Sequence, residues 1–284
     1  MNSRRVIAFG LVAWVLGVPA WAATKGVIQI KSPKTFPFVI NQPGSYQLIG
    51  NLTAPPSVPA IQIDASNVTL DLNGFAVQRA TNGSGTSASG IVATNTDQLN
   101  ITVKNGVVQG FNGSGVDLSG LGHVVTDVRA EGNGFSGIHV AAYSSIEHCT
   151  VTSNGATGIV TDVACSLKDN VSIGNGGTGI KAGQLCTLVQ NTCNVNGVNG
   201  IQMDQSSAAS QNNCSGNNSN GIVGTGGKNS IVGNTCLLNG TAGLDLGSVG
   251  GNYAAQNKLG GNTTAIVNSG GNTVGAGDLA NVTF

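Results

Sequence analysis

The sequence is poor in charged and aromatic side chains. Only 8% of its 284 residues are charged and 4% are aromatic, and 12 Lys and Arg balance 12 Asp and Glu. Nucleic-acid binding depends on clustered cations that displace counterions from phosphates. Because the cations of this chain are few and scattered, the composition excludes nucleic acid as a partner.

Long apolar runs are absent except at the start of the chain. Arg4 and Arg5 precede an apolar run, and the Ala20-Trp21-Ala22 segment then matches an A-x-A cleavage site. The run is shorter than the roughly 20 residues that a membrane-spanning helix needs. We therefore predict that residues 1–22 form a signal peptide, that the mature protein is secreted or periplasmic, and that it has no membrane span.

The 3.6-residue apolar periodicity of long helices is missing too. A small residue followed by an apolar one instead recurs every 21 or 22 residues, with short apolar alternation around it. Alternation over a few residues indicates short strands, and a fixed period of this length indicates a solenoid. The repeat pairs are Gly115-Val116, Gly137-Ile138, Gly158-Ile159, Gly179-Ile180, Gly200-Ile201, Gly221-Ile222 and Gly243-Leu244, preceded by Gly90-Ile91 and followed by Ala265-Ile266.

Other solenoids fit this repeat less well. A leucine-rich repeat needs a leucine-dense consensus, a left-handed hexapeptide helix favours multiples of six, and calcium-binding nonapeptides need Gly-Gly-x-Gly-x-Asp. We predict an all-β fold, a single-stranded right-handed parallel β-helix with coils of about 21 to 22 residues. Residues 23–284 would form this domain, with 23–63 as the N-terminal cap and first coils and 115–266 as the regular coils.

Two columns of asparagine accompany the repeat. An Asn side chain can satisfy backbone groups at a buried turn and also bond the Asn stacked on the next coil. We therefore predict two asparagine ladders at corners of the solenoid. They consist of Asn133, Asn154, Asn175, Asn196, Asn217 and Asn239, and of Asn170, Asn191, Asn212 and Asn234.

The six cysteines follow the same spacing. Cys165 and Cys186 fall in one column, Cys193, Cys214 and Cys236 in another, and Cys149 stands where later coils carry a ladder Asn. One interpretation is a stack of small buried thiols. The alternative is disulfide bonding between neighbouring coils in an oxidising compartment. We favour thiols, because aligned strand positions hold Cβ atoms further apart than a disulfide prefers.

These features resemble the right-handed parallel β-helix superfamily over roughly residues 40–270. The resemblance rests on the Asn-rich units that end in Gly-Ile, on the asparagine columns and on the segments Pro43-Gly44-Ser45-Tyr46 and Asn67-Val68-Thr69-Leu70-Asp71-Leu72-Asn73-Gly74. That superfamily includes pectate lyases, polygalacturonases, alginate epimerases and phage tailspikes, so the resemblance implies the fold but no single activity. Polygalacturonase-like enzymes carry an Asn-Thr-Asp segment, an adjacent Asp pair, a Gly-His-Gly and an Arg-Ile-Lys, and we expect none of them to form a site here, nor a clustered Asp set for calcium.

One exposed strand face is the candidate functional surface. In the strand after each repeat glycine, the first and third residues are apolar, so the second and fourth residues face solvent. The candidate catalytic residues on this face are Asp117, His139, Asp162, Lys181 and Asp204. Asp117 and His139 would be neighbours, and Asp162 and Asp204 would lie about 9.6 Å apart, just beyond the spacing of an inverting carboxylate pair. The alternative is an ordinary charged coat that keeps the sheet soluble.

Two further segments are weaker candidates. Asp127, His148 and Asp169 fall at one corner, where polar residues are usually turn formers. The Gly/Ser-rich segment 81–89 is an insertion that would emerge as a loop, and loops of solenoids often lie on the functional face.

Two functions remain open from the sequence. The first is a non-catalytic cell-surface or periplasmic scaffold that binds polysaccharide or a cell-surface protein. The second is a polysaccharide lyase, hydrolase or epimerase acting on acidic polysaccharides, for which Ca²⁺ is the one cofactor to consider. Sugar rings commonly stack on aromatic faces, and both tryptophans, Trp14 and Trp21, lie within the signal segment. This scarcity favours the first function.

Overall fold

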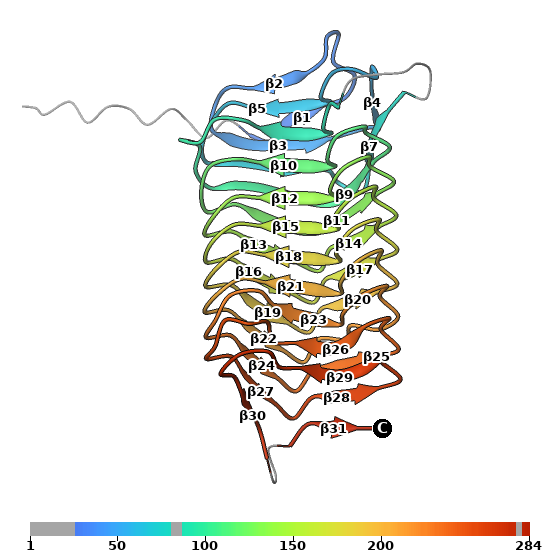
Figure 1. Cartoon of the computed structure of the whole chain (residues 1–284). Helices are drawn as coiled ribbons and strands as arrows, with labels where there is room; N and C mark the ends of the chain where they lie inside the picture. Colours follow the sequence, from blue (N-terminus) through green and yellow to red (C-terminus); the bar gives the residue numbers. More distant parts are fainter. Residues whose placement is uncertain (1–25, 81–86, 277–279) are drawn as a thin grey trace, which may run out of the picture.

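The computed structural model describes residues 26–80, 87–276 and 280–284. The predicted signal peptide and residues 81–86 of the predicted loop lie outside these ranges. The described residues contain no helix and form one parallel β-solenoid, whose coils follow one another along its axis (Figure 1). The all-β prediction is confirmed.

The regular coils contribute short strands to three faces, and the coil of residues 201–221 reaches the third face through an isolated bridge at Asn213. Face 1 is a parallel sheet of eleven strands, one from each successive coil. In it, Val116 pairs with Ile138 and Ile138 with Ile159, which is the register that the glycine repeat predicts. The strands of face 1 are β2 (Phe38–Ile40), β5 (Ile61–Ile63), β8 (Ile91–Ala93), β10 (Val116–Leu118), β12 (Ile138–Val140), β15 (Ile159–Thr161), β18 (Ile180–Ala182), β21 (Ile201–Met203), β23 (Ile222–Gly224), β26 (Ala242–Asp245) and β29 (Thr264–Val267).

Faces 2 and 3 are joined by two long strands, β9 (Ile101–Gln109) and β11 (Val124–Glu131), which pair with strands of both faces. The other strands of face 2 are β1 (Ile28–Ile30), β3 (Gly44–Leu48), β6 (Val68–Asp71), β13 (Ser145–Glu147), β16 (Ser166–Lys168), β19 (Thr187–Val189), β22 (Ala208–Ser210), β24 (Ser230–Val232), β27 (Tyr253–Ala255) and β30 (Thr273–Val274). Those of face 3 are β4 (Leu52–Ala54), β7 (Ala76–Arg79), β14 (Thr150–Thr152), β17 (Val171–Ile173), β20 (Thr192–Asn194), β25 (Thr235–Leu237), β28 (Lys258–Gly260) and β31 (Val282–Thr283).

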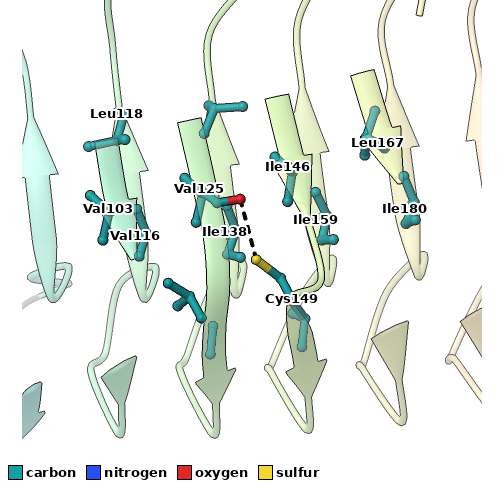
Figure 2. Close-up of a cluster of buried hydrophobic side chains, with 14 of the residues drawn as sticks. Val103, Val116, Leu118, Val125, Ile138, Ile146, Cys149, Ile159, Leu167 and Ile180 are labelled. Atoms are coloured by element: carbon teal, nitrogen blue, oxygen red, sulfur yellow. Dashed lines mark hydrogen bonds between the residues drawn. The ribbon is translucent and has the colours of Figure 1, made fainter. Parts of the chain in front are cut away.

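The core runs through the middle of the solenoid. Apolar side chains from the three faces point inward and stack on the equivalent residues of the next coil (Figure 2). Ile138, Ile159 and Ile180 are fully buried in one such stack. Burial of apolar area at about 25 cal/mol per Å² is the main stabilising contribution of these stacks.

The repeat glycine is required by close packing between coils. A Cβ added at Gly179 would lie 2.6 Å from the carbonyl oxygen of Gly200 and 2.7 Å from Nδ2 of Asn196. Both distances are too short for any side chain, so the regular coils require glycine here, whereas Ala60 occupies the position before β5 in the irregular first coils. Ala265 occupies the position in β29, the last strand of face 1, where no further coil packs against it.

The two predicted asparagine ladders are confirmed. Asn191 shows the pattern: its Nδ2 donates to the carbonyl oxygen of Leu167 at 2.9 Å and to Oδ1 of Asn212 at 3.0 Å. Its own Oδ1 accepts from the backbone N–H and the Nδ2 of Asn170, both at 3.0 Å. Each rung therefore satisfies backbone groups that the corner would otherwise bury without partners.

A third buried column, at the corner between faces 1 and 2, was not predicted. Each of its side chains accepts a backbone N–H from the coil before it, as Ser144 Oγ does from His123 at 3.1 Å and Cys186 Sγ from Cys165 at 3.4 Å. The column consists of His123, Ser144, Cys165, Cys186, Ser207, Asn229, Asn252 and Asn272. The corner thus requires an acceptor atom but no particular residue type.

All six cysteines are buried free thiols. Cys149 occupies a rung of the second ladder, where its N–H donates to Oδ1 of Asn170 at 3.0 Å. Burial raises the pKa of the Cys149 thiol to about 12. This thiol is therefore protonated and acts as a small ladder residue rather than as a nucleophile.

Candidate functional site

Strand alternation places the predicted site residues on the outside of face 1. Asp117, His139 and Lys181 are the central residues of β10, β12 and β18, and the residues on either side of each are buried. Asp162 and Asp204 follow β15 and β21 at the corner where the chain leaves the face. All five side chains therefore lie in two adjacent columns, which run parallel to the solenoid axis.

Asp117 and His139 form a direct hydrogen bond. Asp117 Oδ1 lies 2.9 Å from His139 Nδ1, and each side chain is 37% exposed. This hydrogen bond raises the pKa of His139, with a further contribution from the carboxylate of Asp162 and against the effect of partial burial. The arrangement orients the imidazole and favours its charged form.

Asp162, Lys181 and Asp204 line a hollow of about 420 Å³ together with Gln202. Gly183 lies between the two aspartates in the corner column, and a Cβ there would come within 2.7 Å of the backbone of Asp162. Glycine is therefore required at this one coil, and the missing side chain leaves the floor of the hollow bare. Asp204 is held by the backbone N–H of Gln205, which donates to its Oδ1 at 2.8 Å.

The structure thus brings the five predicted residues together as two groups on one face. The Asp117–His139 pair forms the first group, and the hollow between Asp162 and Asp204 forms the second, with Lys181 beside it. The charge of Asp162 reaches His139 and links the groups. We call these five residues the charged face. It can bind a polar polymer through both charges, and the raised pKa of His139 favours the protonated imidazole that such binding uses.

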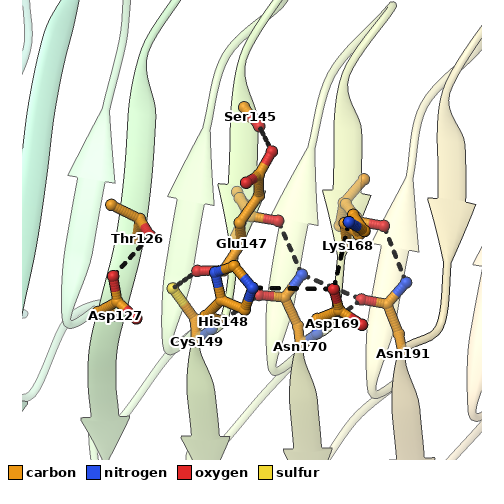
Figure 3. Close-up of polar contacts among 12 residues, drawn as sticks. Thr126, Asp127, Ser145, Glu147, His148, Cys149, Lys168, Asp169, Asn170 and Asn191 are labelled. Carbon is orange, nitrogen blue, oxygen red and sulfur yellow. Dashed lines mark hydrogen bonds and ion pairs between the residues drawn. The ribbon is translucent and has the colours of Figure 1, made fainter.

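The weaker trio lies at the corner between faces 2 and 3. Asp127, His148 and Asp169 each have φ of +54°, so they are turn residues in the left-handed region, as predicted. His148 Nε2 lies 3.8 Å from Asp169 Oδ2, and Lys168 Nζ lies 3.6 Å from the same oxygen (Figure 3). Asp127 accepts a hydrogen bond from Thr126 Oγ1 at 3.0 Å. The three side chains make loose surface contacts, and Asp127 and His148 line a hollow of about 410 Å³.

A further hollow, of about 480 Å³, was not predicted from the sequence. It lies at the corner after face 3 and is lined by Gln78, Arg79, Gln109, Gly110, Glu131, Gly132, Thr152 and Ser153. The signal that would have indicated it is the absence of side chains at two successive coils, Gly110 and Gly132. We call it the corner hollow.

No metal cluster is visible in the part of the chain that the structure describes, where no group of three or more His, Cys, Asp or Glu could hold an ion. The expectation that all polygalacturonase-like elements are missing is wrong for the Asn-Thr-Asp segment, which is present as Asn95-Thr96-Asp97 in the turn after β8. There Asn95 Oδ1 accepts the backbone N–H of Asp97 at 2.9 Å, which is a turn-forming contact.

Three stacked parallel faces with corner ladders define a β-helix protein. The family described as "Right handed beta helix region" matches residues 89–236. The chain therefore belongs to the right-handed β-helix family. A search of curated proteins finds no match.

Several solved structures share the fold. The A-module of mannuronan C-5 epimerase AlgE4 from Azotobacter vinelandii matches with a TM-score of 0.67 and 13% identity, over 90% of this chain and 88% of that one. The periplasmic alginate epimerase AlgG matches with a TM-score of 0.61 and 12% identity, over 87% and 74%. The Dettilon tailspike protein matches with a TM-score of 0.55 and 13% identity, over 90% and 60%. At these identities the likeness concerns the fold. Within the described residues, no helix is long and apolar enough to cross a membrane.

Proposed function

We propose that this is an exported polysaccharide-binding protein whose binding surface is the charged face. The observation that carries the proposal is the alignment of five ionisable side chains along the solenoid axis, beside a hollow. Successive coils are about 4.8 Å apart, so an extended polymer lying along the axis meets a new set of side chains at each coil. Lys181 and His139 can bind carboxylates, and Asp162 and Asp204 can accept hydroxyl hydrogen bonds.

The comparisons support this class of ligand. Two of the similar structures are named as alginate or mannuronan epimerases, and one of these is named as periplasmic. The signal peptide predicted for residues 1–22 agrees with export to the periplasm or the cell exterior. An acidic polysaccharide is therefore the first ligand to test, ahead of a cell-surface protein.

A second function, acid–base chemistry on the bound polymer, is favoured by one observation. A histidine fixed at Nδ1 by a carboxylate is a common arrangement for a general acid or base, and Asp117 and His139 have this geometry. Under this alternative His139 or Lys181 would exchange the proton, as in a lyase, hydrolase or epimerase. Ca²⁺ is the one cofactor to test under this alternative, so activity is measured with and without it.

The test is binding of the purified protein to alginate, polygalacturonate and hyaluronan, with neutral dextran as the control polymer. Lys181→Ala is expected to weaken binding of the acidic polymers about tenfold, the value of one charge-assisted contact of about 1.4 kcal/mol. Lys168→Ala, a lysine in β16 on face 2, is the matched control and leaves binding unchanged. Binding is also expected to weaken as the pH rises through the pKa of His139, because the imidazolium is then lost.

The same incubations separate the two functions. Unsaturated products, new reducing ends and C-5 epimerised residues are measured with and without Ca²⁺. If polymer binds and none of these products forms, the protein is a binding module. If product forms and His139→Asn abolishes it while binding persists, the enzyme alternative is correct. Equal binding by the Lys181→Ala and Lys168→Ala variants would show that the charged face is not the binding surface.

A further inference from the structure

The corner hollow exists because two successive coils, after the coil of Arg79, carry glycine in the same column. Gln78 pairs with Gln109 and Gln109 with Glu131, so Arg79, Gly110 and Gly132 follow in one column. Gly110 and Gly132 have φ of +73° and +60°, and a Cβ added at either would meet no atom within 4 Å. Space for a side chain exists at both positions, and glycine leaves it open. The floor of the hollow is therefore bare backbone.

The two ends of the corner hollow carry opposite charges. Arg79 lies at one end, where its Nε donates to the carbonyl oxygen of Gly110 at 2.7 Å. Glu131 lies two coils further along, and Arg129 Nη1 lies 3.9 Å from its Oε2. With about 4.8 Å per coil, the backbone of Arg79 is about 9.6 Å from that of Gly132, the residue after Glu131. A ligand that spans the hollow meets a cation first and a carboxylate last.

Amide side chains line the wall between these charges. Gln109 Nε2 donates to Gln78 Oε1 at 3.0 Å, and Gln78 Nε2 donates to Thr53 Oγ1 at 3.2 Å. These bonds fix the two amides on the outer surface of face 3. A volume of about 480 Å³ lies within the range of small-molecule sites, roughly 300 to 1,000 Å³.

We propose that the corner hollow binds one carboxylated sugar residue. The carboxylate pairs with Arg79, whose guanidinium has five N–H donors and can serve more than one acceptor. The ring lies over the glycine floor, and hydroxyl groups donate to Glu131 and to Gln109. The polarity of the hollow sets one orientation, because the reverse places two carboxylates together. The site shares no residue with the charged face and lies at a different corner, so either proposal can fail alone.

The experiment measures binding of D-glucuronate by isothermal titration and by saturation-transfer NMR, with D-glucose as the neutral probe. Gly132→Asn places a side chain over the floor, and Asn tolerates positive φ. Gly174→Asn is the matched control: Gly174 lies in the same corner column, with φ of +66° and open space, but outside the hollow. Glu131→Gln removes the distal charge without changing the shape of the side chain.

The expected result is glucuronate binding at least tenfold tighter than glucose binding. Gly132→Asn is expected to weaken it at least tenfold, Gly174→Asn to leave it unchanged and Glu131→Gln to weaken it severalfold. The proposal is overturned if glucuronate does not bind, if glucose binds equally well, or if the two asparagine variants bind alike.

Discussion

The chain places a histidine against an aspartate of the neighbouring coil in two regions, and the two pairs differ. On face 1, His139 and Asp117 occupy paired strand positions and share a 2.9 Å hydrogen bond. At the corner between faces 2 and 3, His148 and Asp169 lie 3.8 Å apart, and Lys168 lies closer to the same carboxylate oxygen. The residue types are alike, but the first pair lies on extended strands and the second on turn residues with positive φ.

This difference shows where the solenoid allows side chains of neighbouring coils to interact. Side chains in paired strands project in parallel, so neighbours one coil apart meet directly. A corner residue with positive φ splays its side chain into solvent, while the residue after it points inward and carries the ladder. On strands the reactive groups are therefore the outward ones. At corners the strong interactions are the buried ones, as between Asn170 and Asn191.

The largest effect on stability is expected from a substitution in a buried asparagine ladder. Asn191→Ala removes both acceptor and donor from the ladder and leaves the N–H of Asn170 and the carbonyl oxygen of Leu167 without partners. We expect a loss of about 3 kcal/mol in the free energy of unfolding, measured by urea denaturation. Asn218→Ala, an exposed asparagine, is the control. Equal stability of the two variants would contradict the structural role of the ladder.

A smaller effect on stability is expected from weakening the hydrogen bond between Asp117 and His139. Asp117→Asn should lower the pKa of His139 toward its ordinary value of 6.5, as followed by NMR titration, because the charge and the main hydrogen bond that raise it are weakened. The folded pKa lies above the unfolded one, so the stabilisation is full below about pH 6.5 and is lost as the pH rises through the folded pKa. We expect a destabilisation below about 1 kcal/mol, larger at about pH 6 than at about pH 9. An unchanged titration curve would rule out the pairing.

The smallest effect is expected at the corner pair. Asp169→Asn keeps a residue type that tolerates positive φ and removes only the exposed charges near His148 and Lys168. The free energy of unfolding should change by less than about 0.5 kcal/mol. A loss above about 1 kcal/mol would show that corners and strands do not differ as described.

The regular coils could be predicted from the sequence because each repeated residue type has a single physical reason. Gly179 and its equivalents in the regular coils have no room for a Cβ, and each ladder amide both donates to and accepts from the neighbouring coils. The third column escaped prediction because its rungs, such as His123, Ser144 and Cys165, share an acceptor atom and no residue type. His123 is fully buried there, and burial lowers its pKa.

The candidate site was only partly predictable. Strand alternation identifies the side chains that face outward, and the pairing of Asp117 with His139 followed from it. The hollow beside Lys181 and the corner hollow did not follow, because each depends on an absent side chain, at Gly183 or at Gly110 and Gly132, relative to the neighbouring coils. Such a relation appears only when the stacking register is known.

The stacking of face 1 also fixes the spacing between outward side chains of successive coils. His139 pairs with Val160 and Val160 with Lys181, so two backbone steps of about 4.8 Å separate the imidazole from the ammonium group. Deleting one complete coil of 21 residues would shorten this separation by one step and keep every side chain pointing outward. A deletion of one residue would turn the outward column inward. Insertions or deletions can therefore change the spacing of outward side chains only in steps of one whole coil, about 4.8 Å.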